Sequence, residues 1–283
     1  MTIRQALAQA VGALQAAGIP DPRTDAALLL ADVTGIPPME LLLHGQQALT
    51  SPQERRISPL LLSRASRKPL QYLLGTQHFY GLSLAVDERA LIPRPETEIL
   101  CELALGLLRA VESPKVLDVC TGSGAIALAV KAQCPAASVT ATDISEDALA
   151  LARENARRHE ASIRFLPGDL FAPVEGETFD CILSNPPYIE SAACLSLQPE
   201  VRFEPLLALD GGADGLDFYR RIAREAAAHL NPQGVLCLEI GDTQGEAVRA
   251  LLEAQGRYRQ ISIHRDLNGS QRVVTAHAAS FPT

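Results

Sequence analysis

The sequence predicts an α/β protein in which a small all-α domain precedes a parallel sheet that ends in an antiparallel hairpin. From residue 115 onward, short apolar strand patterns alternate with helical patterns. This order is typical of a parallel sheet covered by helices on both faces. The last two strand patterns, 258–264 and 272–278, have no helical pattern between them, which predicts a hairpin. The segment before them all, 1–75, shows helical periodicity only.

Three helices are predicted in the segment 1–75. The first carries apolar residues at spacings of four, four and three, namely Ile3, Leu7, Val11 and Leu14. The second covers residues 26–33. The third begins at Ser51, a capping residue followed by Pro52 in the first turn, with Glu54 closing a capping box.

The third helix is basic, with its charges at Arg55, Arg56, Arg64, Arg67 and Lys68. Runs of charge usually form a solvated face, and we favour that interpretation. The alternative is a surface that docks an acidic partner.

The remaining elements follow in order along the chain. Partial alternation over residues 79–86, with a glycine near its turn, predicts a β-hairpin. We therefore expect a helical domain over 1–75, a β-hairpin linker over 76–90 and a larger domain over 91–283. Strands are predicted at 116–119, 138–142, 163–166, 181–184 and 235–240, and helices at 98–111, 125–132 and 146–158.

Composition narrows the class of protein. The chain has 283 residues and a formal charge of −8, of which the segment 1–75 carries +2 and the rest −10. Proteins that grip a phosphate backbone usually have the opposite sign. Because no apolar run is long enough to span a membrane and no secretory signal is visible, we expect a cytoplasmic protein. The six cysteines form no CxxC pair and the six histidines show no metal-binding spacing, so we expect free thiols and no metal.

A glycine-rich turn links the first strand of the larger domain to the helix after it. The turn runs Cys120-Thr121-Gly122-Ser123-Gly124, and Asp143 ends the next strand nineteen residues later. Glycines allow close backbone approach, and an acid at this place can accept hydrogen bonds from ribose hydroxyls. The pattern predicts an adenosine-containing cofactor. Residues 122–127 alone also fit a dinucleotide fingerprint, and a turn used only for packing is the structural alternative.

A second candidate contact follows the third strand of the larger domain. Asp169 is placed to accept from an adenine amino group, while Leu170 and Phe171 are placed to cover the adenine face. The alternative for Asp169 is a helix N-cap.

The tetrapeptide Asn185-Pro186-Pro187-Tyr188 follows the fourth strand. In open sheets, ligands bind at the carboxyl ends of strands. The prolines stiffen the turn, and the Asn185 side-chain oxygen and the Pro186 carbonyl can both accept from one planar NH2 group. Tyr188 offers a flat apolar face. Two acceptors would aim the lone pair of a poor amide nucleophile at an electrophile and stabilise charge on nitrogen.

Residues 118–124, Asp143 and the tetrapeptide, in this order, resemble the class I S-adenosylmethionine-dependent methyltransferases, which have a Rossmann-like sheet. The tetrapeptide is shared by adenine-N6 and glutamine-N5 enzymes. Other segments look like the protein-(glutamine-N5) methyltransferases of peptide-chain release factors. They are residues 69–75, 91–98, 204–205, 209–212 and 265–269, with Arg272.

The resemblance implies a role for each matching position. Residues 120–124, Asp143, Asp169, Leu170 and Asn185 would contact S-adenosyl-L-methionine, and Asn185 with Pro186, Pro187 and Tyr188 would hold the target glutamine. Asn185, Pro186 and Tyr188 would be catalytic. The methyl group would pass to the amide nitrogen of a Gly-Gly-Gln glutamine, giving S-adenosyl-L-homocysteine. The chain departs from the family at Cys120, usually glycine, and at Leu170, often aromatic.

The resemblance also implies a partner, the release factor itself, recognised by the helical domain. We expect a monomer without direct nucleic-acid or membrane contacts. The main alternative, an adenine-N6 DNA or RNA methyltransferase, is disfavoured by the charge of −10 over the catalytic part. A nicotinamide-dependent dehydrogenase leaves the tetrapeptide unexplained. A cofactor-binding regulatory module without turnover is a third alternative.

Overall fold

A computed structural model describes residues 1–279 of the chain. These residues divide into two compact units. The helical unit comprises Met1–Thr76 together with Gln198–Phe203. The sheet unit comprises Gln77–Leu197 and the described residues from Glu204 onward. No helix within residues 1–279 is long and apolar enough to cross a membrane.

The helical unit packs its helices around an aliphatic core. It contains α1 (Ile3–Ala16), α2 (Pro22–Thr34), the 3-10 turn η1 (Pro38–Glu40), α3 (Ser51–Ala65), α4 (Leu70–Leu74) and η3 (Val201–Phe203). Leu14, Leu29 and Ile57 are among the side chains buried between them. The residue that caps α3 is Thr50, whose hydroxyl accepts from the Gln53 amide while Gln53 accepts from the Thr50 amide. The prediction of Ser51 was wrong because two hydroxyl residues precede Pro52 and the first of them closes the box.

The basic helix α3 does not present all its charges to solvent. Arg64 is only 5% exposed. Its Nε donates to Asp25 Oδ2 at 2.6 Å, and its Nη1 donates to Glu200 Oε1 at 3.1 Å. Burial raises the pKa of Glu200, but hydrogen bonds from Arg67 and Arg64 outweigh this effect and hold the pKa below its usual value. The favoured interpretation of a wholly solvated face was therefore wrong for Arg64. The carboxylates that surround it lie 39 and 136 residues away in sequence, so a local pattern of charge could not reveal them.

The sheet unit is built on seven strands in the order β5-β4-β3-β6-β7-β9-β8. The strands are β3 (Lys115–Val119), β4 (Ser138–Asp143), β5 (Arg164–Pro167), β6 (Phe179–Ser184), β7 (Leu230–Glu239), β8 (Tyr258–Arg265) and β9 (Gln271–Ala278). Strands β3 to β7 pair in parallel, and β9 is antiparallel to both β7 and β8. A separate two-stranded hairpin joins β1 (Thr76–Phe79) to β2 (Leu82–Ala85).

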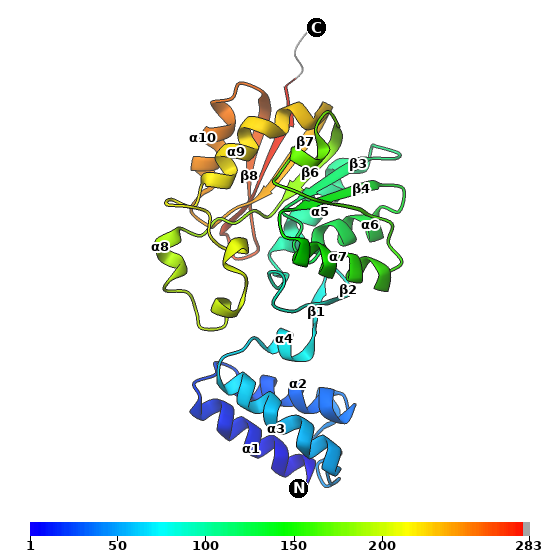
Figure 1. Ribbon diagram of the computed structural model, residues 1–283, viewed down its shortest axis with the longest axis vertical. Helices are drawn as coiled ribbons and strands as arrows, with labels where there is room; N and C mark the ends of the chain where they lie inside the picture. The colour runs from blue at the N-terminus through cyan, green and yellow to red at the C-terminus, as the bar shows by residue number, and fades with distance from the viewer. Residues whose placement is uncertain (280–283) are drawn as a thin grey trace. The chain divides into compact units, whose positions relative to one another are not determined.

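Helices cover both faces of the sheet (Figure 1). They are α5 (Thr97–Leu108), α6 (Ala125–Gln133), α7 (Glu146–Arg158), α9 (Asp217–Glu225) and α10 (Gly245–Glu253). The sheet unit also contains the short helix α8 (Ser191–Cys194), which buries none of its residues, and the 3-10 turns η2 (Ala172–Val174), η4 (Leu206–Ala208) and η5 (Ala226–His229). Val116 of β3 packs in a core with α5 and α6, whereas the next residue, Leu117, packs in a core with α9 and α10. This alternation follows from the two-residue period of a strand. The predicted fold class is confirmed, including the terminal hairpin.

Candidate active site

A cavity of about 210 Å³ opens in the sheet unit where β3 to β6 end. The chain leaves β3 towards β4 and β5 on one side and later returns to β6 on the other. The carboxyl edge at such a reversal is where open α/β sheets bind ligands. Among the described residues, most predicted site residues line this cavity: Cys120, Thr121, Gly122, Ser123, Asp143, Asp169, Leu170, Asn185 and Pro187. Four described residues of the predicted site do not line it: Gly124, Phe171, Pro186 and Tyr188. Phe171 is buried in the core on the α9 and α10 side of the sheet and stacks on His229.

In the glycine-rich turn after β3, every second residue has a left-handed backbone conformation. Cys120, Gly122 and Gly124 all have left-handed φ angles, of 60°, 54° and 82°. A Cβ on Gly124 would lie 3.0 Å from the Cβ of Ala152, so the turn packs against α7 only because this residue is glycine. Gly124 therefore shapes the turn from behind, while its neighbours face the cavity.

Asp118, just before the turn, holds it from inside the fold. Its Oδ2 accepts from the Thr121 hydroxyl at 2.5 Å and from the Ala127 amide at 3.1 Å. Burial raises the pKa of Asp118 to about 7, and these two hydrogen bonds oppose the increase. The carboxyl thus joins the turn to the first turn of α6.

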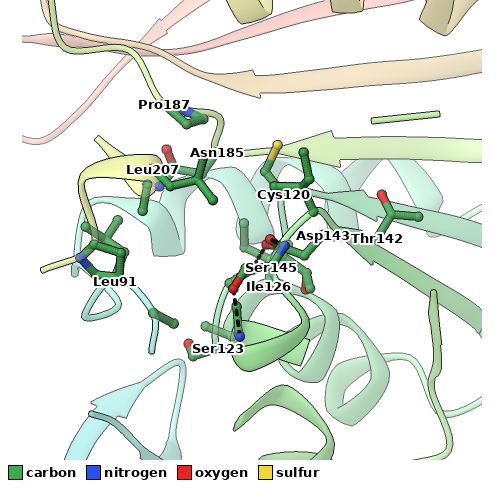
Figure 2. Close-up of a pocket in the computed structure, with 18 of the residues that line it drawn as sticks. Leu91, Cys120, Ser123, Ile126, Thr142, Asp143, Ser145, Asn185, Pro187 and Leu207 are labelled. Atoms are coloured by element: carbon green, nitrogen blue, oxygen red, sulfur yellow. Dashed lines mark hydrogen bonds between the residues drawn. The ribbon is translucent and has the colours of Figure 1, made fainter. Parts of the chain in front are cut away.

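Asp143 at the end of β4 contacts the same turn. Its Oδ2 accepts from the Gly122 amide at 2.8 Å and its Oδ1 from the Ser145 amide at 2.9 Å. Burial raises its pKa in spite of these hydrogen bonds. Figure 2 shows Asp143 and Ser145 together at the wall of the cavity, below Cys120. A carboxylate with two oxygens retains lone pairs that are not used by these amides.

Cys120 and Leu170 give the cavity compact apolar surface. Burial raises the pKa of the Cys120 thiol, which keeps it neutral. Leu170 is buried, has a left-handed φ of 48°, and its carbonyl accepts from the Thr142 hydroxyl at 3.1 Å. Asp169 beside it is exposed and accepts from Arg221 at 2.6 Å through Oδ2. It does not act as a side-chain cap, since η2 has none.

The turn after β6 places Asn185 and Pro187 at the cavity (Figure 2). Ser184 anchors the end of β6 by donating to the Val119 carbonyl of β3 at 2.7 Å. Tyr188 instead packs against the α9 and α10 side of the core, and burial raises its pKa to about 12. A Cβ on Gly211 would lie 2.7 Å from the Tyr188 Cα, so a glycine is required where the chain returns beside the tetrapeptide.

Two of the other segments that carry the resemblance meet at a buried carboxylate. Glu204 accepts from the Ile92 amide at 3.0 Å and from Arg94 at 2.5 Å. Residues on both sides of this contact, Pro93 and Pro205 among them, line the cavity. The proline-rich segment and the segment after Glu204 thus form one wall.

Three polar side chains that the sequence analysis missed hold this site in place. Asn155 of α7 is fully buried; it accepts from the Ala85 amide and donates to the Ala85 and Ser123 carbonyls. Thr97 accepts from Asn185 Nδ2 at 3.3 Å. Glu239, at the end of β7, is 1% exposed. Glu239 had a usable signal, a single carboxylate in the apolar run 235–240.

Comparison with known proteins gives matches over nearly the whole chain. Residues 5–75 match the family model "PrmC N-terminal domain", and residues 97–198 match "Methyltransferase small domain". A release factor glutamine methyltransferase of Deinococcus radiodurans is 46% identical over 279 residues, covering 99% of both chains. One of Moorella thermoacetica is 44% identical and covers 98% of this chain and 99% of the relative.

Solved structures with lower identity show the same fold. A methyltransferase from Pyrococcus furiosus has a TM-score of 0.51 at 21% identity, covering 70% of this chain and 89% of that one. A 16S rRNA methyltransferase of T. thermophilus, in complex with AdoMet and guanosine, has a TM-score of 0.51 at 20% identity, covering 72% and 50%. At these identities the likeness concerns the fold of the sheet alone.

Proposed function

The chain belongs to the release factor glutamine methyltransferase family, and from that premise we propose that it methylates the side-chain amide nitrogen of a glutamine in a peptide-chain release factor. The methyl donor is S-adenosylmethionine. One observation carries the proposal: the glycine-rich turn, Asp143 and the Asn185 turn all border one cavity. This arrangement supports a donor and an acceptor amide held side by side.

The residues of the cavity fit S-adenosylmethionine. Gly122 borders open space, since a Cβ there would have only the Ala90 Cβ within reach, at 4.0 Å. In this proposal Asp143 accepts from the ribose hydroxyls with lone pairs that Gly122 and Ser145 leave free. Leu170 and Cys120 supply apolar contact, and Asp169 lies at the rim for the adenine amino group. The bound group supplies an electrophilic methyl.

The Asn185 turn then orients the substrate. In this proposal the Asn185 Oδ1 and the Pro186 carbonyl accept the two N–H bonds of the glutamine amide, which directs its nitrogen lone pair toward the methyl group. Pro186 itself does not line the cavity but lies between two residues that do, Asn185 and Pro187. Pro187 and Tyr188 keep the turn rigid and apolar. Both acceptors also stabilise the positive charge that develops on the amide nitrogen as the bond to the methyl group forms and the bond from that methyl group to the sulfonium sulfur breaks. The methylated nitrogen is acidic, so its proton leaves without a dedicated base.

The helical part of the chain, residues 1–75, is proposed to recognise the release factor. Its match to an N-terminal family model supports a role specific to this family. We further propose that the enzyme is cytoplasmic, because its proposed substrate is a translation factor. We also propose that it acts as a monomer.

A side-by-side transfer assay tests the proposal. Labelled methyl from S-adenosylmethionine is offered with purified release factor, with DNA and with RNA, and label should enter the release factor alone. In Asn185→Ala, transfer should fall by about two to three orders of magnitude, while calorimetry finds donor binding largely retained. The exposed-site variant Asn268→Ala should match the wild type. Label in nucleic acid, or full activity in Asn185→Ala, would contradict the proposal.

A further inference from the structure

The amide of Asn185 is held by a neighbouring hydroxyl at the wall of the cavity. Its Nδ2 donates to Thr97 Oγ1 at 3.3 Å, and Thr97, the first residue of α5, is 4% exposed. Glu239 ends the neighbouring strand β7, where Leu238 pairs with Ser184, the residue before Asn185. The Glu239 carboxyl is buried beside the Thr97 and Asn185 side chains, and both lower its pKa against the effect of burial.

The donors and acceptors of this cluster match in only one arrangement. An ionised carboxylate accepts only, so both side chains must donate to Glu239. The Asn185 NH2 group has two N–H bonds, and Thr97 with Glu239 provides an acceptor for each. The amide oxygen of Asn185 is then the atom left for the cavity. If the Asn185 amide were rotated by a half turn, its Oδ1 would face the Glu239 carboxylate, and the buried Thr97 oxygen would lose its donor.

From this geometry, and resting on the proposed function, we propose that Glu239 is a positioning residue that fixes the orientation of the Asn185 amide. It acts through Asn185, with Thr97 as its relay, and does not touch the substrate. The consequence is chemical: only an Asn185 amide with Oδ1 toward the cavity can accept from a glutamine NH2 group. A rotated Asn185 would present a second NH2 group, which cannot.

The burial of Glu239 is costly, which fits a positioning role better than a packing role. Its Oε2 has no hydrogen-bond partner among the described residues. Burial raises the pKa of Glu239 to about 7 against the effect of Thr97 and Asn185. The other charged or titratable groups that face it are Glu96, Cys101, Tyr188, Tyr219 and Arg272. A well-packed apolar residue here would avoid this burden.

Protonation of Glu239 would release the constraint. A protonated carboxyl can donate to Asn185 Oδ1, and the rotated amide then loses its penalty. Turnover should therefore fall as pH decreases through about 7, the value for this carboxyl. The same change should leave the affinity for S-adenosylmethionine nearly constant, because Glu239 is absent from the described cavity lining.

The experiment compares Glu239→Gln with the wild type on purified release factor. We expect kcat to fall at least tenfold, with donor affinity by calorimetry within twofold. The acidic limb of the kcat profile near pH 7 should disappear in the variant. The matched control is Tyr219→Phe, which removes a hydroxyl that donates to the Glu239 backbone carbonyl at 2.8 Å and spares the carboxylate. Its kcat should stay within twofold of the wild type.

A second pair of variants keeps the test decisive if Glu239→Gln folds poorly. Thr97→Ser keeps the hydroxyl and should retain activity within threefold, whereas the isosteric Thr97→Val should lose at least tenfold. Wild-type kcat in Glu239→Gln, a parallel loss of donor affinity, or equal behaviour of the two Thr97 variants would overturn the inference. Failure of the wild type to methylate release factor would instead refute the proposed function, so the two failures are distinguishable.

Discussion

Asn155→Asp is the substitution whose cost follows most directly from the structure. Asn155 is fully buried, and its Nδ2 donates to the Ala85 and Ser123 carbonyls, both at 3.0 Å, while its Oδ1 accepts from the Ala85 amide at 2.7 Å. Aspartate has the same shape and keeps the acceptor. It removes both donors and sets a carboxylate oxygen against two carbonyl oxygens.

The magnitude can be worked from these contacts. Each buried acceptor left without its donor costs about 1–3 kcal/mol, and an unpaired buried charge adds to this, so we expect a loss of about 3–5 kcal/mol at pH 8. That is a large part of the ~5–15 kcal/mol by which domains are stable. Burial raises the pKa of the introduced carboxyl, so the loss should be smaller at acid pH, where it is protonated, and grow as pH rises.

Denaturant unfolding at pH 5 and pH 8 measures this prediction. The control is Asn268→Asp, which adds the same charge at an exposed position and should change stability little. Donor affinity should also fall in Asn155→Asp, because Ser123 belongs to the glycine-rich turn. If Asn155→Asp were as stable at pH 8 as the control, the network would not support the site and the reasoning would be refuted.

Three further substitutions have definite expected outcomes. In Gly124→Ala, the left-handed backbone costs about 1–2 kcal/mol and the methyl meets Ala152 at 3.0 Å, so calorimetry should find donor affinity at least tenfold lower; unchanged affinity would contradict this. The neutral Glu239 carboxyl is compatible with burial, so its contribution to the free energy of unfolding is full below its ordinary pKa of 4.5. As pH rises through about 7 the carboxyl ionises and up to about 3 kcal/mol of that free energy is lost. Glu239→Gln should therefore raise Tm at pH 8 but not at pH 4.5, and an equal shift at both would argue against a buried charge. Arg64→Ala leaves the Asp25 carboxylate without its buried partner, while Glu200 keeps Arg67, and should destabilise the helical unit by about 3–5 kcal/mol; hydrogen exchange that is as slow in α2 and α3 as in the wild type would contradict it.

The parts of the fold that the sequence predicted were those with local causes. The helix expected at 146–158 begins and ends where α7 does, since Ser145 caps it and its apolar residues repeat at helical spacing. The turn after β3 was recognisable because glycine favours the left-handed backbone found at Gly122 and Gly124. The terminal hairpin was evident from the missing helical pattern between two strands.

The parts that escaped prediction depend on contacts far apart in sequence. Arg64 looked solvated until Asp25 and Glu200 were seen to surround it. Asn155 looks like any polar residue of a surface helix, and its partners lie 70 and 32 residues away. Local patterns report periodicity and capping; they do not report which buried backbone groups need a partner.

The side chains of the tetrapeptide divide between two tasks that its sequence did not separate. Asn185 and Pro187 face the cavity, while Tyr188 packs into the core beneath it. The expectation that Tyr188 offers a face to the substrate remains a prediction. Its packed position supports a role in keeping the turn rigid.

The central claim is that the Asn185 turn directs a glutamine amide nitrogen at an electrophilic methyl group. Fragmentation mass spectrometry of release factor, after incubation with the enzyme and S-adenosylmethionine, tests it most directly. The account predicts one added methyl on the side-chain nitrogen of the Gly-Gly-Gln glutamine, formed about two to three orders of magnitude more slowly with Asn185→Ala. A methyl found on another residue, or an unmodified glutamine after full turnover of the donor, would contradict it.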